Sequence, residues 1–188
     1  SCEGLTFDQV VAAAFDGRSV PVPECALTWE TNMAPAGIAD AQQDYVEGRA
    51  MRHSRHVGLR GRIPGAADGT IALYVAFRDY QLVDFAAPEA RRWYRELVED
   101  YRGIPLDGIC WDEPAIGGDW NSYRYGASFA RRFAEANGYE LPRRLHLLEA
   151  PGLAPEAVRV RLDYYRALNE SLAEAQADLL AAARAAFG

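Results

Sequence analysis

The feature that most constrains the fold is a strand, helix, strand order in the middle of the chain. Two short apolar runs, Thr70–Phe77 and Asp107–Asp112, are bounded by turn formers and are too brief for helices, which predicts buried strands. Between them, Pro88 opens a predicted helix that Gly103 ends. Its apolar positions recur at helical spacing at Ala90, Trp93, Leu97 and Tyr101. This order predicts a right-handed crossover and a parallel sheet with helices outside it.

The remaining segments extend the alternation. Residues Leu5–Phe15 are predicted as a helix, Cys25–Trp29 as a strand and Ile38–Val57 as a helix ended by Gly58. Downstream of the predicted strand Asp107–Asp112, a predicted helix carries Phe129 and Phe133 on its buried face and ends at Asn137-Gly138. A short helix, Pro142–Glu149, and a long one, Pro155–Phe187, complete the chain. The long helix is expected to bury a stripe formed by Val158, Leu162, Tyr165, Leu172 and Leu179.

The predicted fold class is therefore α/β, a parallel sheet with outer helices, in a single domain over residues 1–188. The 49% hydrophobic and 25% charged fractions are those of an ordinary globular protein. A complete eight-fold barrel needs roughly 250 residues, so the chain is expected to form a partial, TIM-like (β/α)8 barrel. Open edges of such a sheet would favour self-association, because their backbone groups lack partners.

Charge and composition exclude several functions. The net charge of -7 argues against a nucleic-acid partner, which requires clustered basic residues. We expect no membrane partner, because no apolar stretch has the length of a span. No metal site is expected, since His53 and His56 are predicted to lie on a solvated helix face, and no motif indicates a cofactor. Ser1 in place of Met suggests loss of an upstream portion, which leaves localisation open, with the cytoplasm slightly favoured.

Carboxylates and aromatic rings accompany each predicted strand end. In parallel α/β folds, ligands bind at the carboxyl ends of strands. A flat aromatic ring packs on the apolar face of a sugar, and carboxylates bind hydroxyls or transfer protons. The sequence therefore predicts a sugar site. Its candidate binding residues are Trp29, Glu30, Asp79, Tyr80, Trp111, Trp120 and Tyr123.

A resemblance to a known class of enzyme supports this chemistry. The segment Asp107–Pro114, an apolar strand ending in Asp112, Glu113 and a proline, resembles the strand-end motif of barrel glycoside hydrolases. Residues 83–90 resemble the segment that precedes this strand in such enzymes. Residues 129–133, 137–141 and 160–165 are similar to the segments downstream of this strand in large bacterial glycosidases of the galactosidase and rhamnosidase groups. The resemblance implies a hydrolase that cleaves glycosidic bonds by carboxylate acid/base catalysis, without a cofactor.

The resemblance leaves two assignments open for the acidic pair. In retaining β-glycosidases the acid/base glutamate ends the fourth strand, which implies that Glu113 is the general acid. In the α-glucosidase type of barrel a similar strand ends in an aspartate nucleophile, which implies this role for Asp112. Adjacent residues of a strand point to opposite faces, so one acid is expected to react and the other to bind a hydroxyl or hold the loop.

A glycosidase needs a second carboxyl to act as nucleophile or base. Besides the acidic pair, the sequence offers Glu30, Asp79 and Asp84. If none of these completes the pair, the alternative is a noncatalytic carbohydrate-binding module or a truncated barrel remnant.

Overall fold

The computed structural model describes residues 5–31, 57–65, 70–79, 83–106 and 123–188. The chain divides into two compact units. Unit 1 comprises residues 1–81 and 142–152, and unit 2 comprises residues 82–141 and 153–188. Each unit has its own secondary structure and is described separately.

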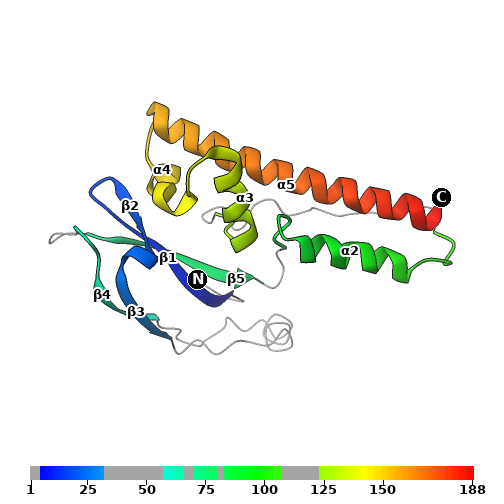
Figure 1. Cartoon of the computed structure of the whole chain (residues 1–188), viewed down its shortest axis with the longest axis horizontal. Helices are drawn as coiled ribbons and strands as arrows, with labels where there is room; N and C mark the ends of the chain where they lie inside the picture. Colours follow the sequence, from blue (N-terminus) through cyan, green and yellow to red (C-terminus); the bar gives the residue numbers. More distant parts are fainter. Residues whose placement is uncertain (1–4, 32–56, 66–69, 80–82, 107–122) are drawn as a thin grey trace, which may run out of the picture. The chain divides into compact units, whose positions relative to one another are not determined.

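Unit 1 is built on an antiparallel β-hairpin (Figure 1). Strand β1, Leu5–Phe15, pairs with β2, Arg18–Pro21, across a two-residue turn. Asp16 and Gly17 both have positive φ, 49° and 71°, which is the backbone geometry that tight hairpin turns require. The predicted helix over Leu5–Phe15 is therefore wrong. The informative signal is the Asp-Gly pair, because Asp-Gly between apolar runs is a strong hairpin signature.

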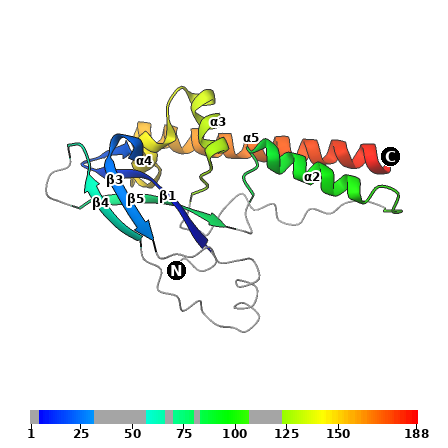
Figure 2. The ribbon, with the colours of Figure 1, turned by 60° about the horizontal axis from the view of Figure 1, so that its bottom comes forward.

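The sheets of unit 1 are antiparallel, which contradicts the predicted parallel sheet. Strand β5, Ala72–Asp79, lies on the other side of β1, giving the order β2-β1-β5. A second sheet pairs β3, Ala26–Thr31, with β4, Val57–Arg62 (Figure 2). The described part of the chain thus contains no parallel (β/α)8 arrangement with outer helices. The strands at 72–79 and 26–31 form where the sequence predicts strands, but their sheet partners run antiparallel to them.

Short helical segments accompany these sheets. The 3-10 helix η1, Val22–Glu24, follows β2, and η2, Leu141–Arg144, precedes α4, Leu145–Glu149. Helix α4 packs on β1 and β2, which places the predicted short helix of residues 142–149 within unit 1.

Unit 2 is helical, with α2 and α3 packed on the long helix α5 (Figure 1). Helix α2 spans Pro88–Asp100, α3 spans Ala127–Asn137 and α5 spans Pro155–Phe187. The bounds of α5 and the end of α3 confirm the sequence prediction, and Gly138 after α3 adopts a left-handed φ of 75°. Proline at the first helical position marks the start of both α2 and α5.

The buried face of α5 differs from the predicted stripe. Leu162 and Tyr165 are 60% and 51% exposed, whereas Tyr164 is 1% exposed. Small residues are frequent on the true face, which consists of Ala157, Val160, Asp163, Tyr164, Ala167, Leu168, Ser171, Leu172 and Ala175. Apolar periodicity predicts that the face with the largest apolar side chains is buried. Small side chains let neighbouring helices approach α5 closely, so the face that carries the small residues is buried instead.

Candidate functional site

The predicted binding residues in unit 1 lie on two separate sheets. Trp29 and Glu30 belong to β3, where their backbone partners are Leu59 and Gly58 of β4. Asp79 is the last residue of β5 and pairs with Leu5. The expectation that these strands end side by side at one edge of a parallel sheet is therefore wrong, because β3 and β5 belong to different antiparallel sheets.

The residues predicted to carry the chemistry fall outside the described residues. These are Tyr80, Trp111, Asp112, Glu113 and Trp120. Their assignment as catalytic or substrate-binding groups stays a prediction. Among the candidates Tyr123 has a described side chain, and it belongs to unit 2.

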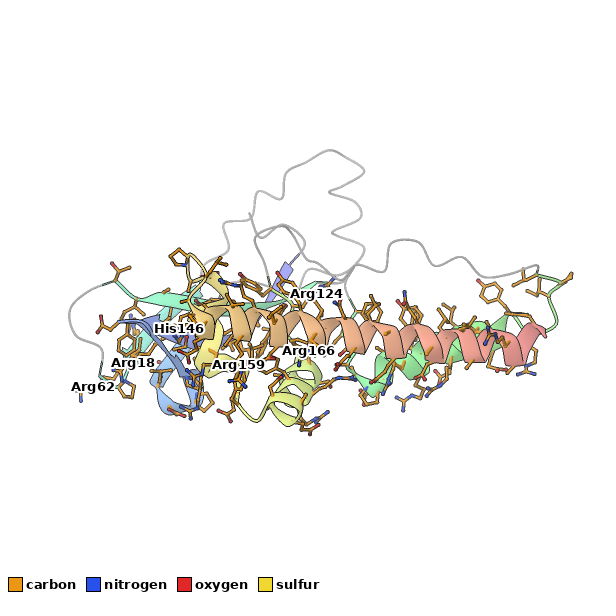
Figure 3. All side chains as sticks on the ribbon, turned by 90° about the horizontal axis from the view of Figure 1, so that it is seen from above. Arg18, Arg62, Arg124, His146, Arg159 and Arg166 are labelled. Carbon is orange, nitrogen blue, oxygen red and sulfur yellow. The ribbon has the colours of Figure 1, made fainter. Side chains whose placement is uncertain are left out.

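Tyr123 is half-buried against the side of Tyr164. The two ring centroids are 5.7 Å apart and the ring planes are perpendicular, the edge-to-face arrangement that aromatic pairs favour. Phe129 meets Tyr164 in the same way at 5.4 Å. Tyr164 also donates its hydroxyl to the backbone carbonyl of Arg124 at 3.0 Å. The residues that precede α3 are therefore anchored on α5. Figure 3 labels Arg124 beside this helix.

Asp84 has an unusual carboxyl environment in unit 2. One carboxylate oxygen accepts the backbone N–H of Ala86 at 3.0 Å, and the carboxylate also accepts the backbone N–H of Phe129. Ala86 lies just before α2, and Phe129 lies in the first turn of α3. A single carboxylate thus accepts one backbone N–H just ahead of α2 and one in the first turn of α3, where orphan N–H groups and the helix dipole favour negative charge.

Gly126 makes this placement possible. A Cβ atom at residue 126 would overlap the carboxylate of Asp84. The backbone of Gly126 is extended, so the glycine is required by the close approach of Asp84 and not by its own φ angle. Asp84 is one of the three carboxyls that the sequence offers as a second catalytic group, but no sequence signal links it to Gly126.

Burial raises the pKa of Asp84, while the two backbone N–H groups and the positive charge of Arg124 oppose this rise. A carboxyl with a raised pKa can hold a proton closer to neutral pH, as acid catalysts do, although its hydrogen bonds also serve the helix ends. We therefore take Asp84 as the centre of the candidate site.

A second polar cluster lies in unit 1, around Ser19 and His146. The Ser19 hydroxyl lies 2.8 Å from Nδ1 of His146 and also accepts the backbone N–H of the same residue at 3.1 Å. Ser19 is 7% exposed, and His146 lies in the first turn of α4. This geometry caps α4 and ties it to β2. The buried hydroxyl is occupied at the helix end, so we assign the pair a structural role.

Metal-binding clusters and membrane-spanning helices are not found among the described residues. In this part of the chain, no three His, Cys, Asp or Glu side chains gather to form a metal site. Over the same ranges, no helix has the length and apolar character needed to cross a membrane. No family model, curated protein or solved structure matches this chain.

Proposed function

We propose that the chain acts on carbohydrates as a glycosidase-type hydrolase, with Glu113 as the general acid. The observation that carries this proposal is the segment 107–114, an apolar run that ends in two acids and a proline. Hydrolysis requires an acid to protonate the departing glycosidic oxygen and a carboxylate to attack the anomeric carbon or activate water. Asp112 as nucleophile is the competing assignment for the same pair.

Asp84 supports this proposal from the described part of the chain. It precedes α2, and Gly126 precedes α3, so the contact between them brings together the two flanks of the stretch that contains segment 107–114. The raised pKa of Asp84 is consistent with a carboxyl that serves proton transfer.

Asp84 is also the best remaining candidate for the second carboxyl. Glu30 and Asp79 lie on separate sheets of unit 1, whereas Asp84 lies in unit 2. We propose that its first role is to hold the start of α3 in place. It becomes the reacting partner of Glu113 only if Asp112 proves dispensable, because the reaction requires two carboxyls.

The test is turnover of aryl glycosides by the full chain. Nitrophenyl glycosides, which carry an activated phenol, and unsubstituted phenyl glycosides, which carry a poor leaving group, of glucose, galactose and rhamnose in both anomeric forms would be assayed with the wild type and with Glu113→Gln. We expect Glu113→Gln to lower kcat/KM by roughly 10²- to 10⁴-fold for sugars with poor leaving groups, and by less for activated phenols, which need little protonation. Glu135→Gln, at an exposed position of α3, is the matched control and should retain full activity.

Two outcomes would overturn the proposal. Unchanged turnover of the phenyl glycosides in Glu113→Gln removes Glu113 as the acid, and a complete loss in Asp112→Asn on activated phenols would then transfer the leading role to Asp112. Absence of turnover on every substrate, together with saturable binding of a sugar, would identify a noncatalytic carbohydrate-binding module.

A further inference from the structure

Helix α2 presents large apolar side chains to solvent. Trp93, Leu97 and Tyr101, here called the apolar stripe, are 55%, 38% and 47% exposed. They recur every four residues and therefore lie along one face over two helical turns, about 12 Å. The sequence predicts this face as the buried one. Exposed large apolar side chains that are neighbours on one helix face indicate a site of interaction.

A different face of α2 packs on α5. Val98 is buried, at 4% exposure, and Tyr94 packs on the cluster formed by Phe85, Leu172 and Ala175. Arg95 contacts Asp178 of α5 at 3.3 Å. The contacts with α5 therefore leave the apolar stripe uncovered and hold it on an ordered helix.

Carboxylates border one side of the apolar stripe. Glu89, Glu96 and Asp100, here called the acidic rim, lie three or four residues from a member of the stripe, so they are its neighbours on the helix surface. Glu96 faces Arg92 at 3.8 Å, which is an exposed and weak pair. Within the described ranges, Glu89 and Asp100 form no ion pair. The rim is thus a net negative border.

The acidic rim argues against a second copy of this chain as the occupant. Two antiparallel copies of α2 that joined their stripes would place each rim opposite its own equivalent, and like charges in such positions repel. The net charge of -7 adds to this repulsion. A partner with basic residues beside its apolar face would instead meet the rim with complementary charge.

We propose that the apolar stripe and the acidic rim form a docking surface for an amphipathic helix whose apolar face is bordered by lysine or arginine. Apolar residues of the partner at positions i, i+4 and i+7 would contact Trp93, Leu97 and Tyr101, as apolar faces of paired helices do. A guanidinium or ammonium group of the partner could also stack on the Trp93 indole. This proposal does not depend on the glycosidase function.

The experiment titrates the full chain with two designed helical peptides. Both carry leucines at i, i+4 and i+7, and they differ in having lysine or glutamate at the flanking positions. We expect saturable binding of the lysine peptide, weakened by added salt, and much weaker binding of the glutamate peptide. The double variant Trp93→Ala/Leu97→Ala should lose about tenfold or more in affinity, because aromatic anchors dominate such interfaces.

A matched pair of charge reversals separates the acidic rim from the overall charge. Asp100→Lys should weaken binding of the lysine peptide severalfold and strengthen that of the glutamate peptide, whereas Glu135→Lys on α3 should leave both within about twofold. Far-UV circular dichroism verifies that each variant is folded. Equal effects of the two reversals, or unchanged affinity in Trp93→Ala/Leu97→Ala, would overturn the proposal. So would self-association that this double variant abolishes, because a second copy would then be the occupant.

Discussion

The carboxylate of Asp84 occupies the space where a side chain at Gly126 would begin. Through this approach, one acidic residue reaches an amide group just ahead of α2 and another in the first turn of α3. The stability of unit 2 should therefore depend on this contact and on the contacts that Tyr164 and Glu174 of α5 make.

Gly126→Ala should destabilise the protein because its Cβ would collide with Asp84. Overpacking of this kind costs about 1 to 3 kcal/mol in free energy of unfolding. Asp84→Ala removes the obstacle but also the helix-end acceptor, at a cost of about 1 to 2 kcal/mol. In urea unfolding, the double variant Asp84→Ala/Gly126→Ala should therefore lose less free energy of unfolding than the sum of the losses in the two single variants. Strict additivity would contradict the contact.

The pKa of Asp84 predicts a pH dependence of stability. Because burial raises this pKa in the folded state, the folded protein favours the protonated carboxyl. The resulting stabilisation is fully present below the pKa of the unfolded chain and is lost as the pH rises through the folded pKa. The amide side chain of the variant Asp84→Asn cannot ionise, so the variant does not lose stability through this group as the pH rises.

Urea unfolding of the wild type and Asp84→Asn across a pH series would measure the effect. We expect the wild type to be most favoured relative to the variant at acidic pH, below the usual aspartate pKa of about 3.9, and to lose this advantage toward neutral pH. A difference that grows with rising pH would show that the hydrogen bonds from Ala86 and Phe129 outweigh burial. The variant Glu135→Gln supplies the baseline for an exposed carboxyl.

Tyr164→Phe should destabilise the protein more than Tyr165→Phe. The Tyr164 hydroxyl donates to the carbonyl of Arg124, and its ring is almost fully buried. Loss of the hydroxyl leaves that carbonyl without this donor, at a cost of about 1 to 3 kcal/mol. Tyr165 is 51% exposed. The same change there should therefore cost less than about 0.5 kcal/mol. Equal unfolding midpoints for the two variants would refute the anchoring role.

Glu174→Gln should have a small, salt-sensitive effect. Both carboxylate oxygens of Glu174 accept hydrogen bonds from Arg132 at 2.6 Å. These bonds lower the pKa of Glu174, so its contribution is present above the pKa of the unfolded chain and is lost as the pH falls through the folded pKa. Because the side chain is 48% exposed, we expect a cost of at most about 1 kcal/mol at neutral pH.

Thermal unfolding of Glu174→Gln at low and high salt would test this prediction. The difference from the wild type should shrink at high salt, where exposed charges are screened. A large cost that salt does not change would mean that Glu174 acts through packing. Glu156→Gln, at the exposed start of α5, gives a comparison on the same helix.

The surroundings of Asp84 mark the limit of sequence-based prediction at the candidate site. Asp84 is recognisable as a carboxyl ahead of a helix that begins at Pro88, and the sequence offers it for catalysis. Its second contact, with the start of α3, depends on Gly126, which lies far downstream in the chain. A local sequence pattern cannot predict a contact between residues so far apart in the chain, because the residues around Asp84 carry no information about those around Gly126.

Local sequence signals were sufficient to predict helix ends that are marked by proline or glycine. Proline at the first turn and glycine after the last one determined where α2 and α5 begin and where α3 ends, since these residues act on the backbone of their own segment. Tertiary packing alone decided the rest. The partners of β1 and β5, and the buried faces of α2 and α5, depend on which distant surfaces meet. Apolar periodicity identifies the faces of a helix or strand that can be buried. Which of these faces is buried depends on where a neighbouring helix or strand packs.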